Sequence, residues 1–387
     1  MLLCYTQKVY PDAELESALV FTLDACRFTY NKLLEHIRDT KCSKYDSQAY
    51  LVDLKEQHPF LQNVYSKTLQ MVNHNLWSNI KALSGSKKKG RKVGKLRFRA
   101  KDRFRTFQLN QSGFSFTDKG LKLSKIGTLP VTFDVDPNTV KGVVITKKRN
   151  YWQVAVQVEE PDVDIIIPQS SVGIDLGLSS FSTDSNGLQI ENPRFSKNAE
   201  PKLKKVHRSL SRKAKGSNNW KKAKAKLSES YEKVKNQRKD FAHKVSRMYV
   251  NTYDQIIVED LNIKQLKEHK FKSTRRSVSD VSWNQFISFL TYKAESAGKF
   301  LIKVNPKNTS QICSFCGSYV QKDVSVRVHN CTCGLSLDRD YNAALNILNR
   351  GIGHPSQPVE LQPLHHLSVM QVVSMKQEAP SSKLVRV

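Results

Sequence analysis

The sequence contains no long apolar segment. No run approaches the roughly 18 apolar residues that mark a transmembrane helix. The first residues, Met1 to Gln7, also lack the basic and apolar regions of a secretory signal peptide. We therefore expect a cytoplasmic protein with no membrane partner.

Several catalytic signatures are missing as well. The sequence has no Gly-x-x-x-x-Gly-Lys-Ser/Thr phosphate loop, no Ser-His-Asp pattern and no catalytic cysteine signature. These absences argue against the nucleotide hydrolases, serine hydrolases and cysteine proteases that such motifs mark.

Acidic residues are scarce. The 387 residues include 63 Lys and Arg but only 35 Asp and Glu, which gives a formal charge of +28. So large an excess favours an anionic partner, and nucleic acid is the usual one. A basic surface that merely maintains solubility, or a ribosomal type of RNA binder, explains the same charge. Charge therefore identifies the class of partner and not the activity.

Cysteine is sparse over most of the chain and clustered at one place. Three of the seven cysteines are isolated from one another, namely Cys4, Cys26 and Cys42. The other four lie within 21 residues, which in a reducing compartment favours a metal site over disulfides. Cys313-x-x-Cys316 and Cys331-x-Cys333 predict a zinc ribbon, and four sulfur ligands leave no open position, so this zinc is expected to be structural. The second pair is tighter than usual, and His329 is the alternative ligand if Cys331 or Cys333 cannot reach the metal.

The N-terminal part mixes helical and strand patterns. With 39% hydrophobic residues, the chain can form two or three packed domains. A strand is predicted over 2–10, helical periodicity over 13–37 and 64–83, and short alternating runs with turn sequences over 114–159. The alternating runs predict an antiparallel sheet or small barrel. A polar, proline-bounded joint over 161–170 then predicts a domain boundary.

One N-terminal segment, from Lys87 to Arg105, is intensely basic. It holds eleven Lys and Arg and a single acid, Asp102, with Phe98 and Phe104 interleaved. Basic residues among aromatics suit phosphate contact and base stacking, so we expect a flexible nucleic-acid-binding segment. A solvated linker that leads into an ordinary strand explains the same residues.

The C-terminal part alternates strands and helices in a defined order. The sequence first predicts three strands, at 171–175, 179–183 and 188–190, and then a long helical region at 197–249. A strand at 255–259, a helix at 282–298 and a strand at 300–304 follow. The cysteine insert at 305–337 and a last helix at 341–349 complete the order. This order is that of an α/β, ribonuclease-H-like (RNase H-like) domain with an insert. The region 197–249 carries 18 Lys and Arg against four acids, which indicates an anion alongside. Residues beyond Gly351 are expected to pack little.

Three acids stand at the ends or starts of these elements. Asp175 and Glu259 each end an apolar strand, and Asp340 opens the last helix. Taken alone, each has an ordinary explanation: a strand-end acid, a salt-bridge partner and an acid favoured by the helix dipole. Together they predict a catalytic metal site, because a buried carboxylate needs a cation and oxygen ligands suit Mg²⁺ or Mn²⁺. Two such ions can cleave a phosphodiester backbone. Arg327, between the cysteine pairs, is either a substrate-phosphate contact or a solvated arginine.

Ordered motifs over most of the chain resemble those of the TnpB family of transposon-encoded RNA-guided nucleases, relatives of the type V CRISPR effectors. The motifs are Gly173-Ile174-Asp175-Leu176-Gly177, residues 236–244, Val258-Glu259-Asp260-Leu261, Trp283-Asn284-Gln285-Phe286, Tyr292-Lys293-Ala294-Glu295, residues 309–317 and residues 338–347. The Cys-x-Cys pair is the visible departure from the commoner pattern.

The resemblance implies a domain organisation and a metal triad. It implies a RuvC-like nuclease domain over 171–304 and 338–350, with the zinc ribbon 305–337 inserted, and Asp175, Glu259 and Asp340 as the triad. Asp340 is favoured over Asp338 because the matching acid directly precedes x-Asn-Ala-Ala. The remaining parts are a β-rich, wedge-like nucleic-acid-binding domain over 1–10 and 86–165, a helical recognition region over 11–85 and a flexible tail over 351–387.

The activity that the resemblance implies is RNA-guided DNA cleavage by an enzyme of a transposable element. Its expected partners are a guide RNA and target DNA, and a monomer is the favoured state. All three acids are present, so we expect cleavage. The triad alone also fits a DNA transposase that performs strand transfer, and a non-catalytic zinc-ribbon regulator is the alternative in which the acids are structural.

Overall fold

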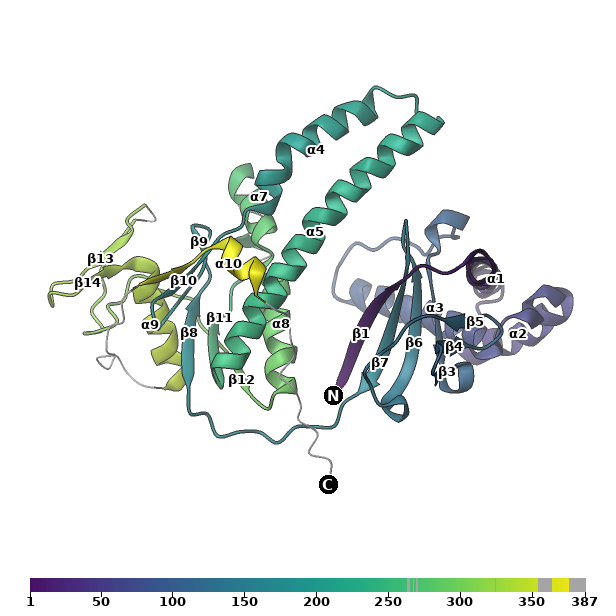
Figure 1. The fold of residues 1–387 in the computed structure, drawn as a ribbon, viewed down its shortest axis with the longest axis horizontal. Coiled ribbons are helices and arrows are strands. Elements are labelled where there is room, and N and C mark those ends of the chain that lie inside the picture. Colours follow the sequence, from purple (N-terminus) through teal and green to yellow (C-terminus); the bar gives the residue numbers. More distant parts are fainter. Residues whose placement is uncertain (263–264, 267, 269–270, 324, 354–363, 376–387) are drawn as a thin grey trace. The chain divides into compact units, whose positions relative to one another are not determined.

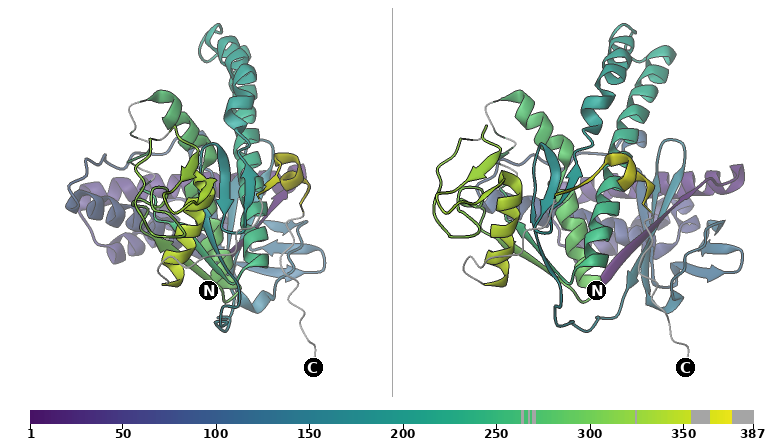
Figure 2. Two further views of the ribbon diagram at one scale, coloured as in Figure 1. Left: turned by 90° about the vertical axis from the view of Figure 1, so that its left-hand side faces the viewer. Right: turned by 60° about the vertical axis from the view of Figure 1, so that its left-hand side comes forward.

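The computed structural model describes residues 1–262, 265–266, 268, 271–323, 325–353 and 364–375 (Figures 1 and 2). The chain divides into two compact units, Met1–Asp162 and Val163–Val387, which we treat separately. The division falls within the proline-bounded joint 161–170. In the described ranges, no helix combines the length and apolar character that crossing a membrane requires.

The N-terminal unit combines three helices with two antiparallel sheets. The helices are α1 (Ala13–Thr40), α2 (Lys44–Gln57) and α3 (Ser66–Lys88). One sheet has the strand order β1-β7-β6-β2, formed by Leu2–Val9, Trp152–Glu159, Val140–Lys147 and Thr106–Asn110. The other has the order β3-β4-β5, formed by Phe114–Thr117, Gly120–Leu123 and Gly127–Leu129. Short 3-10 turns occupy Pro59–Asn63, Lys101–Arg103, Gln111–Gly113 and Pro137–Thr139.

Alternation along the strands builds the core of this unit. In β7, Trp152, Val154, Val156 and Val158 are buried and the residues between them are partly exposed, as a strand with one packed face requires. Helix α2 lies outside the predicted helical segments. Its three buried residues, Ser47, Leu51 and Leu54, form too short a stripe to give a strong periodic signal, and a capping box of Ser43 and Asp46 starts it instead.

The basic segment that follows α3 is held against α1 over residues 96–99, so the expectation of a flexible segment is wrong for this part. The Asn31 amide bonds both backbone groups of Arg99, at 3.1 Å to its carbonyl and 2.8 Å from its N–H. The Arg38 guanidinium donates to the carbonyl of Leu96 and lies 4.9 Å over the Phe98 ring. Anchoring the backbone in this way leaves many lysine and arginine side chains of the segment exposed to a partner.

The C-terminal unit is built on a six-stranded sheet in the order β12-β11-β8-β9-β10-β15. Its strands, in that order, are Phe300–Val304, Gln255–Glu259, Ser171–Asp175, Ser180–Asp184, Leu188–Glu191 and His365–Leu367. Strand β11 runs parallel to both β8 and β12, whereas β9 is antiparallel to β8 and β10. A separate hairpin, β13 (Val328–Asn330) with β14 (Ser336–Asp338), belongs to the cysteine insert.

Helices cover both faces of this sheet. Helices α5 (Asn218–Thr252) and α8 (Trp283–Ser296) bury apolar side chains against one face, together with Val172 and Ile174 of β8. Helix α9 (Arg339–Ile352) packs on the other face. A Cβ on Gly173 would lie 2.3 Å from the carbonyl oxygen of Ala344 in α9, so only glycine permits this close crossing. The short helix α7 (Lys272–Val281) precedes α8.

The predicted long helical region is two helices, α4 (Phe195–Ser211) and α5, which form a hairpin (Figure 1). The side chain of Ser217 accepts a hydrogen bond from the backbone N–H of Trp220 and starts the second helix. Basic residues dominate both helices and the turn between them, so the charge pattern alone did not reveal the break.

Part of the C-terminal tail is packed, contrary to the prediction that residues beyond Gly351 pack little. Strand β15 pairs in parallel with the edge strand β10, and helix α10 (Val369–Ser374) packs against α5 with Val372 buried. The open hydrogen-bonding edge of β10 and the apolar Val372 explain why this part of the tail is fixed. Residues 354–363 and 376–387 of the predicted flexible tail lie outside the described residues.

Candidate active site and metal centre

The strand register places two of the predicted acids side by side. In the parallel pair β8 and β11, Gly173 lies opposite Ile257 and Ile174 opposite Val258, so the next same-face pair along the ladder is Asp175 and Glu259. Alternate residues of a strand face opposite sides. Gly173 and Ile257 face α9, and Asp175 and Glu259 therefore face α9 as well.

The third acid comes from the start of α9. A Cβ on Gly177, two residues after Asp175, would lie 4.0 Å from Oδ2 of Asp340. The neighbouring acid, Asp338, caps the helix, because its Oδ1 accepts hydrogen bonds from the N–H groups of Asp340 and Tyr341 at 2.9 and 3.0 Å. The structure thus commits the carboxylate of Asp338 to the helix and leaves that of Asp340 beside β8.

Glu259 is buried and fixed by a hydroxyl group. It is 7% exposed, and Thr309 donates a hydrogen bond of 2.5 Å to its Oε1. Burial raises the pKa of Glu259, whereas the Thr309 bond and the positive charge of Arg350 act in the opposite direction. Thr309 stands at the start of the cysteine insert, so this contact ties the insert to the end of β11.

The environment of Asp175 shifts the pKa of its carboxyl group strongly. Loss of water around it raises its pKa well above the ordinary value, and the negative charges of Glu259 and then Asp340 raise the pKa further. Among the residues that the structure describes, the Asp175 carboxylate has no hydrogen bond or ion pair. The positive charge of Arg339 acts in the opposite direction but does not offset this rise. A metal cation would further favour the ionised carboxylate, and the oxygen ligands of the three acids are of the kind that Mg²⁺ or Mn²⁺ binds.

Arginines flank the carboxylates. Arg339 donates to Oδ1 of Asp340 from two nitrogens, each at 3.1 Å, and Arg327 approaches Oδ2 at 3.8 Å while remaining half exposed. Arg327 therefore lies beside the acid cluster and is also exposed to solvent. The oxygens of Asp175, Glu259 and Asp340 do not all come within 4.8 Å of one another. Asp175, Glu259 and Asp340 would hold divalent cations between them, and such ions would supply positive charge among the three acids.

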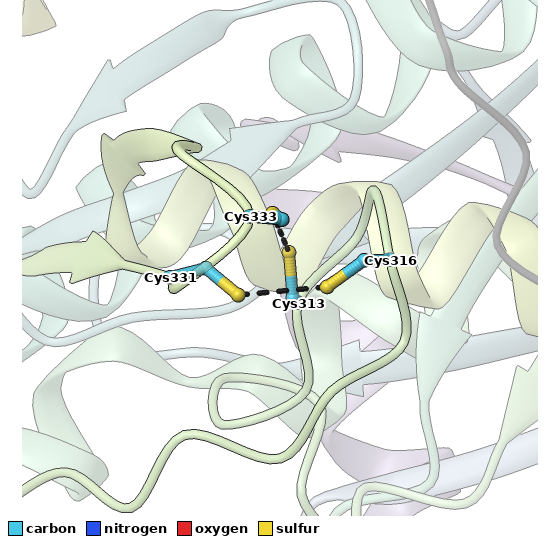
Figure 3. Close-up of side chains that lie close together, drawn as sticks. All are labelled: Cys313, Cys316, Cys331 and Cys333. Atoms are coloured by element: carbon cyan, nitrogen blue, oxygen red, sulfur yellow. Dashed lines mark hydrogen bonds between the residues drawn. The ribbon is translucent and has the colours of Figure 1, made fainter.

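The four clustered cysteines come together closely (Figure 3). Their sulfurs all lie within 4.8 Å of one another, with Cys313 and Cys333 at 3.7 Å and Cys316 and Cys331 at 3.5 Å. A tetrahedron with Zn–S bonds of about 2.3 Å has edges of about 3.8 Å, so the sulfurs fit zinc. Each pair is followed by a glycine with positive φ, Gly317 at 75° and Gly334 at 89°, which lets even the tight Cys-x-Cys pair turn back to its ligand position.

His329, the alternative zinc ligand, lies outside this group of four. Its ring is buried and its Nδ1 contacts the ammonium group of Lys322. Because the sulfurs of both cysteine pairs reach the cluster, the geometry does not require a histidine.

Two asparagines join the insert to α9, and sequence reasoning missed them. Oδ1 of Asn342 accepts from the N–H of Ser314, and its Nδ2 donates to the carbonyl of Ile312. Nδ2 of Asn346 donates to the carbonyls of Thr309 and Ile312. Their spacing of four residues on a predicted helix next to the insert was the available signal. These bonds connect the cysteine cluster to the helix that carries Asp340.

Comparison with known proteins gives the family. Family models described as a probable transposase, a Cas12f1-like TNB domain and a helix-turn-helix domain match residues 153–270, 283–347 and 1–40. A Streptomyces pristinaespiralis protein, described as a candidate RNA-guided DNA endonuclease, is 30% identical over 97% of this chain and 95% of its own length. The chain belongs to the TnpB family.

Other similar proteins and a solved structure were also found. InsQ of Escherichia coli K12, with the same description, is 27% identical over 88% of this chain and 90% of its own. A TnpB-like mimivirus protein is 32% identical over 50% of this chain and 39% of its own. A Cas12f1 complex with guide RNA and target DNA covers 90% of this chain and 99% of its own at 18% identity and a TM-score of 0.35. In this TnpB chain the helix-turn-helix match covers strand β1 and the single helix α1.

Proposed function

We propose that this TnpB-family protein is an RNA-guided DNA endonuclease of a transposable element, with Asp175, Glu259 and Asp340 as its catalytic residues. The observation that carries the proposal is the register of β8 and β11, which sets Glu259 beside Asp175 on the face where α9 begins with Asp340. The descriptions of the two long relatives as RNA-guided DNA endonucleases support the guide RNA and the DNA target.

The strand order supports an RNase H-like, RuvC-like assignment for the C-terminal unit. Three consecutive antiparallel strands, β8, β9 and β10, are extended beyond β8 by the parallel strands β11 and β12. We assign the nuclease domain to 171–304 and 338–350 and the structural zinc ribbon to 305–337. In the N-terminal unit we assign the wedge-like domain to 1–10 and 86–165 and the recognition region to 11–85.

Each group of this site has a defined part in cleavage. Divalent cations bound there would supply the charge that activates water and stabilises the leaving oxygen. Asp175 and Glu259 would bind them from adjacent strands, and Thr309 holds the Glu259 carboxylate in position. Arg327, at 3.8 Å from Asp340 and half exposed, is placed to neutralise a phosphate that approaches that acid.

The test is guided cleavage by the purified protein. The protein is isolated with its bound RNA, the RNA is sequenced, and DNA complementary to its variable end is incubated with the complex and Mg²⁺. We expect the complementary DNA to be cut and a scrambled DNA to remain intact. Strand-joined products without dependence on the RNA would support a transposase instead, and binding without any cleavage would support a regulator.

A further inference from the structure

The α4–α5 hairpin is a strongly basic surface that neither metal site uses. Residues 197–249 carry 18 Lys and Arg against four acids. No residue of α4 is buried, and in the outer half of α5 only a thin seam that includes Ala223 and Val234 is buried. Figures 1 and 2 show the two helices projecting from the body of the C-terminal unit. Such a hairpin adds little to the core, so packing does not explain its length.

The hairpin extends past the end of the sheet where the acids lie. Helix α5 has 35 residues, or roughly 52 Å at 1.5 Å per residue. Strand β11 has five residues, or roughly 17 Å. The C-terminal third of α5 packs on the sheet through Phe241, Val245 and Tyr249 and then turns directly into β11. Helix and strand therefore run in opposite directions, and the outer half of α5 extends beyond the end of β11 that carries Glu259 (Figure 1).

One flank of the hairpin combines lysines with aromatic rings. Lys224 and Lys235 are exposed and eleven residues apart, which is close to three helical turns. Tyr231 lies between them with half of its surface exposed, and its hydroxyl is 2.7 Å from Nε2 of His207 in α4. The ammonium group of Lys224 lies 4.9 Å over the ring of Trp220 near the tip.

The opposite flank is basic but has no such rings. Lys222 and Lys233 are also exposed and also eleven residues apart. Glu229 lies four residues before Lys233 and seven after Lys222, and so shares their flank. Basic side chains interleaved with exposed aromatic rings suit a single strand, because phosphates bind the cations while unpaired bases stack on the rings.

From these observations we propose that the flank formed by Trp220, Lys224, Tyr231 and Lys235 binds single-stranded DNA and holds the strand that enters the carboxylate site. This rests on the proposed nuclease function for the identity of the strand. The binding itself requires only the flank, and it can be measured without cleavage.

The experiment compares two matched pairs of substitutions in the full-length protein with its bound RNA. Each pair is combined with Asp175→Ala so that the DNA stays intact. The probe is a fluorescent single-stranded DNA of about 30 nucleotides, unrelated to the RNA and several times the length that one binding groove of this kind covers. Its dissociation constant is measured over a range of salt concentrations.

We expect the double variant Lys224→Gln with Lys235→Gln to have a shallower slope of log Kd against log salt concentration. The slope should fall by about 1.4, since each phosphate contact to a single strand contributes about 0.7. Tyr231→Ala should weaken binding more than about fivefold, as loss of one stacked base does, while Tyr231→Phe keeps the ring and the affinity. Lys222→Gln with Lys233→Gln should leave the salt dependence and the affinity unchanged.

Three results would overturn the proposal. Equal losses for the two lysine pairs would show that total charge, and not this flank, binds DNA. No loss for either pair would exclude the hairpin. Loss of the co-purified RNA in the Lys224 and Lys235 variant would assign the flank to RNA. If the parent protein binds the probe through this flank but never cuts complementary DNA, the nuclease proposal fails and the binding proposal stands.

Discussion

The two candidate metal centres of this protein are assembled in opposite ways. The cysteine ligands come from 21 consecutive residues, and their sulfurs already lie within 4.8 Å of one another. The carboxylates come from two strands and a helix, and their oxygens remain further apart. Short turns within the insert bring the thiols together, whereas the strand register and the packing of α9 bring the carboxylates together. The first centre is a product of local sequence, and the second is a product of the fold.

The largest expected effect separates two acids that are two residues apart. Asp340→Asn should reduce guided DNA cleavage by more than about 100-fold, beyond the 10–100-fold loss that follows removal of an outer-sphere partner. Asp338→Asn keeps the helix cap, because asparagine caps as well as aspartate, and should retain cleavage within severalfold. Rates measured under identical Mg²⁺ conditions make the comparison, and equal losses would remove the distinction between the two acids.

Loss of the cysteine centre should act on the active site through the asparagine bonds to α9. Cys316→Ser should abolish the single zinc per chain, expose 305–337 to proteolysis and lower cleavage, because Asn342 and Asn346 then lose their fixed partners. Zinc content, limited proteolysis and cleavage rates check this. Cys42→Ser, outside the cluster, is the control and should change none of them. A Cys316→Ser protein with full zinc content would contradict the four-sulfur site.

A smaller effect tests the hydroxyl that links the two centres. The Thr309 hydrogen bond lowers the pKa of Glu259 against the effect of burial. Thr309→Val removes the bond, so the pKa should rise, less Glu259 should be ionised at a given pH, and the cleavage profile should move to higher pH. A loss of about 10–100-fold in metal affinity or rate is expected. Thr309→Ser should restore the profile, and an unshifted profile for valine would exclude this role.

The smallest expected effect concerns Asp184, a buried acid that is not one of the three proposed metal ligands. Asp184 is 0% exposed, its Oδ1 accepts from the N–H groups of Asn186 and Leu188, and burial raises its pKa to about 6. The folded state then binds the proton more tightly than the unfolded state, so stability falls as pH rises from about 4 to about 6 and is level above it. Asp184→Asn keeps the side-chain oxygen that accepts these hydrogen bonds, and it should raise the free energy of unfolding by about 1–3 kcal/mol near pH 7.

Chemical denaturation at pH 4.5 and pH 7 measures this change. The pH dependence attributed to Asp184 should disappear in Asp184→Asn while the cleavage rate is unchanged. A cleavage loss comparable to that of Asp340→Asn would instead place Asp184 in the active site.

Much of the nuclease unit could be predicted from sequence, for reasons that these residues make clear. Strands 171–175, 255–259 and 300–304 lie where they were predicted, because apolar runs bounded by an acid or glycine have sharp ends. The acids at their ends could be named, but not their adjacency, which depends on a register between strands 84 residues apart. The partners Thr309, Asn342 and Asn346 are polar residues, and only the four-residue spacing of the two asparagines gave a sequence signal. Their roles exist only after the insert meets α9.

The errors have physical causes as well. The tail was expected to be loose because its composition is polar, yet three residues that pair with an open sheet edge and one buried valine suffice to fix its described part. The basic segment after α3 was expected to be flexible because of its charge, but its backbone is held by Asn31 and Arg38, which lie more than 50 residues earlier. Composition predicts which side chains of a segment are exposed to solvent. It does not predict which distant residues hold the backbone of that segment in place.

The most direct test of the account is the Mg²⁺ dependence of guided cleavage in the parent protein and in Asp175→Ala, with zinc and RNA measured in both. The account predicts one zinc and a full complement of RNA in each protein, Mg²⁺-dependent cleavage of complementary DNA by the parent, and less than about 1% of that rate in the variant, a loss larger than outer-sphere changes produce. Cleavage by Asp175→Ala at the parent rate would contradict the carboxylate site.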